Sequence, residues 1–345
     1  MKKIRILSID GGGIRGILPG TIVTYLEEQI RHKTGNATAH IGEYFDFLSG
    51  TSTGGILSLI YLCPGEDKKY KFSAKDALDL YLKLGGEIFD IDLRQKIESM
   101  GGICDEKYEA NNLEEALEEY FGKKTLNDVL KPCLISSYDI RNRKAHFFTS
   151  LDAESDIYNY QLKDVARATS AAPTFFEPVR IKSLYGTPHA LVDGGVFANN
   201  PTLCAYAEAR NIQFSKVLDN PEKPNKPSAK DMLIVSVGTG SVKQPYPYED
   251  YKDAGVLKWI NPLIDIMMTG NSETVDYQLK KIYDTLAVED CEDYYRIQPQ
   301  LIHADSAMDN AKPGNLKVLH EDGLAAVEKH KEQLDEIVQK LISNH

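Results

Sequence analysis

The chain has 345 residues, of which 42% are hydrophobic and 26% charged, as expected for a globular protein with a large core. Its 40 basic and 51 acidic side chains give a net charge of −11, which disfavours broad electrostatic binding to nucleic-acid polymers or anionic membranes. The five cysteines contain no CxxC pair, which argues against a disulfide framework or a zinc site and favours a reducing, cytoplasmic compartment.

The first expected element is a buried strand over residues 4–9 (IRILSI), which ends at the glycine-rich run of residues 10–16 (DGGGIRG). Apolar residues then recur at helical spacing over residues 14–30, so the glycines lie on a strand-to-helix turn. The run also matches the letters GxGxxG of a dinucleotide site. Because no strand ending in an acidic residue follows about twenty residues later, we expect no nucleotide cofactor.

Residues 45–63 predict a second strand, turn and helix, and the turn between them reads GTSTG. GxSxG between a strand and a helix is the setting of a nucleophile elbow. Such a turn raises the hydroxyl of Ser52 above the sheet, while Gly50 and Gly54 let the strand and the helix pass closely. The start of the helix then places a positive dipole where an oxyanion forms.

The remaining pattern continues the alternation of strands and helices. Residues 64–130 are expected to be a mostly helical insertion over the sheet, with Ser73 suited to cap one of its helices. The later expected elements are paired strands over 132–140 and 144–150, a helix over 162–169, strands over 190–192 and 232–237, and an amphipathic helix over about 321–342.

This order predicts an α/β fold with a mostly parallel central sheet and helices on both faces. We expect one domain over residues 1–345, with the chemistry-bearing motifs in residues 4–240 and a largely helical extension over residues 241–345. Within that extension, residues 256–268 (VLKWINPLIDIMM) hold the only tryptophan. They fit an interfacial or lid segment or an acyl-chain wall, but ordinary core or a subunit contact is favoured because such side chains are usually buried.

A serine nucleophile needs a base. Asp193 follows a short apolar strand and precedes Gly194 and Gly195, so a buried carboxylate there could serve as that base, although an Asp-Gly turn explains the same letters. A Ser-His-Asp arrangement is the alternative, and His303 is its only serious candidate among the later histidines, which are His146, His189, His303, His320, His330 and His345.

Three blocks in this order resemble the patatin-like phospholipase family. Residues 10–16 look like its oxyanion-hole loop, residues 50–54 like its nucleophile elbow, and residues 193–195 (DGG) like the segment that carries its catalytic aspartate. Residues 168–176 (ATSAAPTFF) and 199–201 (NNP) resemble two further blocks. The likeness covers residues 4 to about 240, and the blocks are specific together although each is weak alone.

The resemblance implies a three-layer α/β/α fold and a Ser–Asp dyad without a catalytic histidine. It also implies a phospholipase A or lysophospholipase activity on fatty-acyl esters. Ser52 would form an acyl intermediate and Asp193 would be the general base. The implied oxyanion hole consists of the backbone N–H groups of Gly11, Gly12 and Gly13, with that of Arg15 added.

We further expect no metal and no cofactor, a membrane phospholipid or lysophospholipid substrate, and a cytoplasmic protein that contacts the membrane peripherally. A homo-oligomer is compatible with the sequence. The side chain of Arg15 fits either a phosphate headgroup or a structural salt bridge. The alternatives to a lipid acyl hydrolase are a Ser-His-Asp carboxylesterase, a non-catalytic storage or binding protein of the same family, and a nucleotide-activated bacterial defence effector, for which no residue gives direct support.

Overall fold

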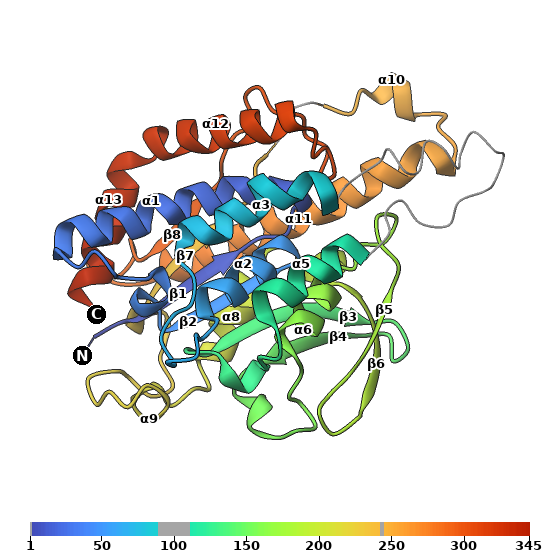
Figure 1. Cartoon of the computed structure of the whole chain (residues 1–345). Helices are drawn as coiled ribbons and strands as arrows, with labels where there is room; N and C mark the ends of the chain where they lie inside the picture. Colours follow the sequence, from blue (N-terminus) through green and yellow to red (C-terminus); the bar gives the residue numbers. More distant parts are fainter. Residues whose placement is uncertain (1, 89–110, 242–244) are drawn as a thin grey trace.

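The computed structural model describes residues 2–88, 111–241 and 245–345. Their strands form one eight-stranded sheet in the order β5-β6-β3-β2-β1-β7-β8, with β4 paired to β3. Helices cover both faces of this sheet (Figure 1), which confirms the predicted three-layer α/β/α fold. The strands are β1 Ile4–Ile9, β2 Phe47–Thr51, β3 Cys133–Asp139, β4 Lys144–Thr149, β5 Val179–Lys182, β6 Pro188–Asp193, β7 Met232–Val237 and β8 Tyr294–Ile297.

The centre of the sheet is parallel. β1 pairs with β2 and β7, β2 pairs with β3, and β7 pairs with β8, all in the parallel sense. The antiparallel pairs lie at one side and involve β4, β5 and β6. β1 and β2 are buried along their whole length, and for β1 this agrees with its nearly continuous apolar run. Because β1 and β2 are parallel neighbours, their carboxyl ends open at the same edge, where α/β folds usually bind ligands.

Two hydrophobic clusters fill the space between the sheet and its helices. Alternate side chains of β1 point to opposite faces, so Leu7 and Ile9 join the larger cluster while Ile4 and Ile6 join the smaller one. The larger cluster packs under α1 Ile17–Thr34, α2 Thr53–Leu62, α3 Ala74–Ile88, α5 Asn111–Phe121, α6 Leu162–Thr169, α12 Pro313–Lys329 and α13 Lys331–Ser343. The smaller one packs under α8 Thr202–Ala209, α9 Phe214–Val217 and α11 Val256–Tyr283.

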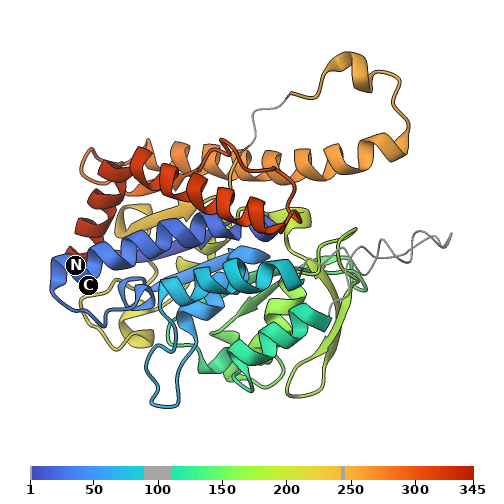
Figure 2. The same cartoon turned by 45° about the horizontal axis from the view of Figure 1, so that its top comes forward.

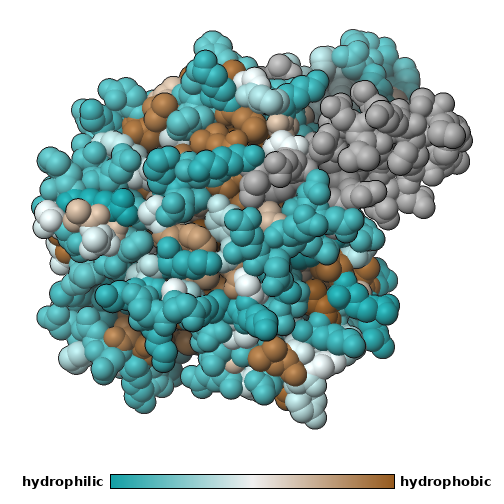
Figure 3. All heavy atoms as spheres, in the orientation of Figure 1, coloured by the Kyte–Doolittle hydropathy of each residue, from teal (hydrophilic) through white to brown (hydrophobic). Residues whose placement is uncertain are grey.

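The region of residues 64–130 contains α3 and α5, and its residues 89–110 lie outside the described part of the chain. The expected cap is present at α3, since Ser73 Oγ accepts from the N–H of Asp76 and the Asp76 carboxylate accepts from the N–H of Ser73. α3 contacts α1, α2 and α12, so it belongs to the helical layer over the sheet. The face formed by α1, α3 and α5 is mostly hydrophilic, with scattered apolar side chains (Figure 3).

Two parts of the C-terminal third differ from the sequence expectations. The single helix expected over residues 321–342 is wrong: α12 begins at Pro313 and a break at His330 separates it from α13. This bend lets both helices pack on α1, a tertiary constraint that helical periodicity does not reveal.

For residues 256–268, ordinary core or a subunit contact was favoured. Ordinary core is wrong for much of their length, since Val256, Leu263 and Met267 are exposed, and the subunit contact stays a prediction. These residues begin α11, and the first turns of this helix extend with α10 Tyr248–Tyr251 beyond the rest of the molecule (Figure 2). Among the described residues, no helix combines the length and the apolar character needed to cross a membrane. The apolar stretch near residues 47–63 forms β2, the turn and α2, as predicted.

Candidate active site

Ser52 lies on a sharp turn between β2 and α2. Its backbone has φ 54° and ψ −124°, which is unusual for a residue with a side chain and is the strained geometry of a nucleophile elbow. The neighbouring glycines allow the close approach of strand and helix. A Cβ atom at Gly50 would lie 2.1 Å from the carbonyl oxygen of Gly54, and one at Gly54 would lie 2.1 Å from that of Ile9.

Hydrogen bonds hold the strained turn in place. The N–H of Ser52 donates to Oγ1 of Thr169 at 2.8 Å, and this hydroxyl donates to the carbonyl oxygen of Ser136 on β3 at 2.6 Å. Thr169 is the last residue of α6 and is fully buried. The position of Ser52 is therefore fixed by the sheet and by α6 together, as a strained functional backbone requires.

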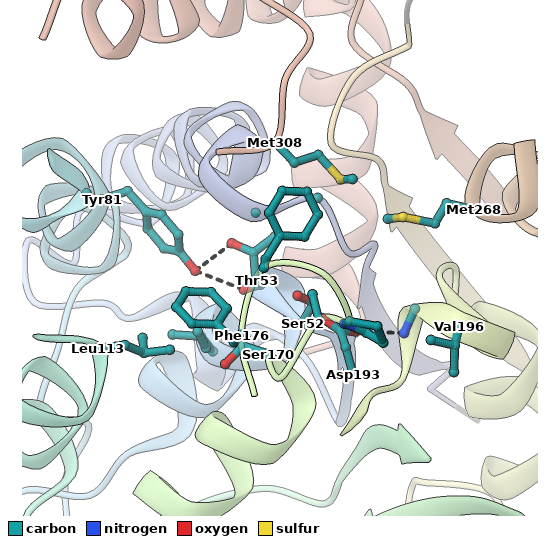
Figure 4. A pocket seen from close by; sticks show the side chains of 18 of the residues that line it. Ser52, Thr53, Tyr81, Leu113, Ser170, Phe176, Asp193, Val196, Met268 and Met308 are labelled. Carbon is teal, nitrogen blue, oxygen red and sulfur yellow. Dashed lines mark hydrogen bonds between the residues drawn. The ribbon is translucent and has the colours of Figure 1, made fainter. Parts of the chain in front are cut away.

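Asp193 ends β6 beside the elbow, and Figure 4 shows its side chain next to that of Ser52. Its carboxyl group accepts a hydrogen bond from the N–H of Gly195 at 2.7 Å, and the neighbouring Ser52 hydroxyl favours its charged form. Only 4% of Asp193 is exposed. Burial raises the pKa of Asp193 to about 7, although the hydroxyl of Ser52 and the N–H of Gly195 act in the opposite direction. The carboxyl group is thus suited to exchange a proton with Ser52 near neutral pH.

The two glycines after Asp193 have different uses. A Cβ atom at Gly194 would lie 2.2 Å from Oγ of Ser136, so only glycine lets the chain pass β3 there. Gly195 begins the short helix α7 Gly195–Ala198 and supplies the N–H that binds the carboxyl group of Asp193.

The glycine-rich loop after β1 offers fewer free amides than the sequence suggests. The N–H of Gly11 donates to the carbonyl oxygen of Asn199 at 3.0 Å, and that of Arg15 donates to Gly12 O at 3.2 Å. Within the described parts of the chain, the N–H groups of Gly12 and Gly13 have no partner. Gly12 and Gly13 both line the pocket that contains Ser52, whereas Gly11 and Arg15 do not.

Close contacts explain why this loop contains three consecutive glycines. A Cβ atom at Gly12 would lie 2.3 Å from Oγ1 of Thr239, whose hydroxyl donates to the carbonyl oxygen of Gly11 at 2.6 Å. Gly13 has φ +58°, and a Cβ atom there would lie 2.2 Å from the carbonyl oxygen of Met308. The loop is pressed between the segments after β7 and before α12.

A buried ion pair anchors the start of the same loop. The two terminal nitrogens of Arg296 on β8 donate to the carboxylate of Asp10 at 2.8 and 2.5 Å, and Ser272 Oγ on α11 donates to it at 3.3 Å. The guanidinium of Arg296 also donates to Ser236 Oγ and Gln298 Oε1, so two further hydrogen bonds hold it in position. This arrangement ties the glycine loop to both β8 and α11.

The side chain of Arg15 is buried, and its Nε donates weakly to the carbonyl oxygen of Gly12 at 3.5 Å. It makes no ion pair with any carboxylate of the described residues, so the salt bridge considered from the sequence is absent there, while the headgroup contact stays a prediction. Burial lowers the pKa of the Arg15 guanidinium, and the charge of Asp265 on α11 partly offsets this.

Ser52 and Asp193 line an apolar pocket with about 1130 Å³ of empty space, part of it open to solvent. Figure 4 shows Ser52 and Asp193 on one side of this space and aromatic and methionine side chains around it. Its apolar walls come from α3, α5, residues 172–176, α11 and the segment before α12: Leu80, Tyr81, Leu113, Leu117, Phe175, Phe176, Ile264, Met267, Met268 and Met308. Such walls fit a hydrocarbon chain better than a polar substrate.

No histidine of the chain, all eight of which lie in the described residues, lines this pocket. His303 is exposed, and its backbone N–H donates to the carboxylate of Asp322. His189 contacts Asp139 at 3.1 Å, away from Ser52. The geometry therefore brings Ser52 together with a carboxyl group and not with an imidazole.

Sequence reasoning missed several residues that build the site. Thr169 lies in a block noted only for its family likeness, and Arg296 and Met308 lie in segments without a motif. Thr239 could have been found, because it stands between two glycines directly after a buried strand. Turns of this kind often bring the backbone close to a ligand or to another loop.

Comparisons with known proteins point to one family. The family model described as "Patatin-like phospholipase" matches residues 7–206, a range that contains both Ser52 and Asp193. "Patatin-like protein 1" of Arabidopsis thaliana is 33% identical over 93% of this chain and 80% of its own. "Patatin-like protein 1" of Oryza sativa subsp. indica is 32% identical over 92% and 80%. A Solanum tuberosum protein named "Probable inactive patatin-3-Kuras 1" is 30% identical over 93% and 86%.

Proposed function

Because this chain belongs to the patatin-like phospholipase family, we propose that it is a serine hydrolase that releases fatty acids from phospholipids or lysophospholipids. Ser52 is the nucleophile and Asp193 the general base. The observation that carries this proposal is that these two side chains lie next to each other in the lining of an apolar pocket. The elbow geometry of Ser52 adds support, since it exposes the hydroxyl to a bound ester.

In the first half of the reaction, Asp193 takes the proton of the Ser52 hydroxyl while Oγ attacks the ester carbonyl. The tetrahedral intermediate collapses to an acyl-Ser52 ester, and the proton passes from Asp193 to the leaving alcohol. In the second half, Asp193 takes a proton from water, which attacks the acyl ester. As the bond between the acyl group and Ser52 Oγ breaks, Asp193 gives this proton to Ser52. The fatty acid then leaves, and both side chains return to their resting state.

The oxyanion of each tetrahedral intermediate is stabilised by the backbone N–H groups of Gly12 and Gly13. Among the described residues these two donors have no partner, whereas those of Gly11 and Arg15 are engaged. Pre-set amide donors matter because the loss of one such donor typically lowers the rate by ~10²–10³-fold. The proposed oxyanion hole thus has two backbone N–H donors, whereas the family resemblance implies four.

The proposal is favoured over the two main alternatives by specific residues. A Ser-His-Asp esterase needs an imidazole near Ser52, and the eight histidines all lie outside the pocket. A non-catalytic relative would most simply have lost Ser52 or Asp193. Both residues are present here, although one similar potato protein is named as probably inactive.

Ser52→Ala is expected to abolish fatty-acid release, with kcat falling by at least ~10⁴-fold, because no other group replaces the nucleophile. The measurement is fatty acid released from phosphatidylcholine, phosphatidylethanolamine and their lyso forms, by wild type and variant. Ser170→Ala is the matched control, since Ser170 lines the same pocket and its hydroxyl donates to the carbonyl oxygen of Ala166 instead. Equal release by wild type and Ser52→Ala would overturn the proposal.

A further inference from the structure

The first three turns of α11 carry an unusual set of exposed apolar side chains. Val256 is 79% exposed, Leu263 51% and Met267 48%, and Trp259 and Ile266 are also exposed. Their spacing of three and four residues places them on one stripe of the helix. Figure 2 shows this part of α11 projecting from the molecule together with α10. Large exposed apolar patches of this kind mark interaction surfaces.

This stripe leads directly to the active-site pocket. Met267 is half exposed and at the same time lines the pocket, and its neighbours Ile264 and Met268 line it too. Met267 therefore belongs both to the exposed stripe and to the wall of the space that holds Ser52. An apolar chain that leaves a surface covered by this stripe can enter the pocket without crossing water.

Aromatic side chains with polar tips surround the stripe. Tyr248 is 75% exposed, and the ring of Tyr251 lies 5.1 Å from that of Trp259. The hydroxyl of Tyr246 donates to Asp265 on α11 at 2.9 Å, which ties this loop to the helix. Tyrosine and tryptophan are enriched at the boundary between hydrocarbon and water, because each has an apolar body and a polar edge.

We propose that the α11 surface, defined here as Val256, Trp259, Leu263, Ile266, Met267 and Tyr248, inserts into the surface of a phospholipid bilayer and delivers an acyl chain to the pocket. This inference rests on the proposed function, because it names the membrane as the source of the substrate.

The charges around the surface indicate which kind of membrane. Four acidic residues (Glu249, Asp250, Asp253 and Asp265) and two lysines (Lys252 and Lys258) fall within residues 245–267, which gives a net charge of 2 − 4 = −2. Such a segment is not attracted to anionic lipid. Insertion is therefore driven by apolar burial, and we expect binding to zwitterionic vesicles that anionic lipid does not strengthen and salt changes little.

The chain offers a direct reporter, since Trp259 is its only tryptophan. On addition of phosphatidylcholine vesicles, the emission of Trp259 is expected to move to shorter wavelength and to be quenched by lipids brominated in the acyl chains. Unchanged emission and no quenching at saturating lipid would overturn the proposal.

A triple variant, Val256→Ser with Trp259→Phe and Leu263→Ser, tests the surface without touching the pocket, which none of these residues lines. Its vesicle affinity in co-sedimentation is expected to fall by ~10–100-fold, from the apolar area that two truncated side chains no longer bury. The matched control is Val217→Ser with Val288→Ser and Leu324→Ser, which removes exposed apolar groups elsewhere and should leave the affinity unchanged.

Activity assays separate this inference from the proposed function. On a soluble short-chain ester, the triple variant should retain wild-type kcat/KM within about twofold, while its hydrolysis of vesicle lipid falls with its affinity. If wild type hydrolyses neither substrate, the proposed function fails, and vesicle binding by Trp259 emission still tests the surface. A second copy of the chain is the alternative partner for the α11 surface. If the wild type is a dimer, and the triple variant is a monomer with unchanged vesicle affinity, membrane docking is contradicted.

Discussion

Replacement of Asp193 by asparagine is expected to lower kcat/KM for ester hydrolysis by ~10³–10⁴-fold, because the amide keeps the shape of the side chain but cannot accept the Ser52 proton. The hydrogen bond from Gly195 can persist, so the loss reports on the base rather than on the fold. Steady-state kinetics on a soluble ester measures the effect, with Asp67→Asn on the exposed surface as a control. A decrease below tenfold would mean that another group takes the proton.

The pH dependence of kcat/KM is also expected to differ between wild type and Asp193→Asn. Burial raises the pKa of Asp193 to about 7, and the base works only when unprotonated. The wild-type kcat/KM should therefore rise with pH through about 7 and then level off. In Asp193→Asn this ionisation is absent, so its small residual activity should not follow the same curve.

The stability of the fold should decrease as the pH rises, whereas kcat/KM increases. Because the pKa of Asp193 is raised on folding, the folded chain holds a proton between about pH 4 and 7 that the unfolded chain has lost, so its stability falls across this range as the pH rises. Asp193→Asn removes this penalty. Its Tm should exceed that of wild type at pH 8 and approach it near pH 4, a trade-off expected where an active site buries a charge.

Gly12→Ala is expected to lower kcat by ~10²–10³-fold or more, the usual cost of a lost oxyanion donor. The new Cβ atom would lie 2.3 Å from Oγ1 of Thr239, so the loop must shift and carry the N–H groups of Gly12 and Gly13 away from the oxyanion. Gly314→Ala is the matched control, since a Cβ atom there meets nothing within 4 Å. Both variants are compared by kcat and by Tm.

Two readouts separate a lost oxyanion hole from a disturbed fold. In the first case kcat falls while the Tm of Gly12→Ala stays within a few degrees of wild type, because the loop lies at the edge of the core. A folded Gly12→Ala protein with wild-type kcat would show that the amides of this loop take no part in the reaction. That result would leave Ser52 and Asp193 untouched and would redirect the search for oxyanion donors.

Much of the site's scaffold could be predicted from sequence because its signals are local. β1 is a buried parallel strand whose nearly continuous apolar run ends at glycines, and β2 leads into the GTSTG turn. The elbow at Ser52 follows from GxSxG in that setting. The meeting of Ser52 with Asp193 is different, since it depends on how β6 pairs with β3. The residues alone left Asp193 open between a base and an Asp-Gly turn, and the family resemblance favoured the base.

The parts that could not be predicted depend on contacts between distant segments. Strands β5 and β8 have four residues each and are specified by their pairing with β6 and β7 rather than by a pattern of their own. Arg296 matters because β8 brings it to Asp10. Whether a backbone amide such as that of Gly11 is free is also invisible in the sequence, since its partner is the carbonyl oxygen of Asn199.

The exposure of the apolar stripe of α11 could not be predicted from the sequence either. Composition alone favoured a buried segment, because large apolar residues are usually inside. Which face of α11 meets the rest of the protein is decided by its contacts with α7, α8 and β8. Later residues of α11 point inward, since Asn271 donates to the carbonyl oxygen of Phe197 and Val275 packs in the core. Its first turns line the pocket and face outward.

The most direct test of the account is to find which residue carries the acyl group. Wild-type protein is labelled with a fluorophosphonate ester, which traps an activated serine, and the modified peptide is identified by mass spectrometry. We expect a single adduct on Ser52, absent in Ser52→Ala and formed at least ~10²-fold more slowly in Asp193→Asn, because the general base is lost. An adduct on another residue, or equal labelling rates in wild type and Asp193→Asn, would contradict a Ser52–Asp193 dyad.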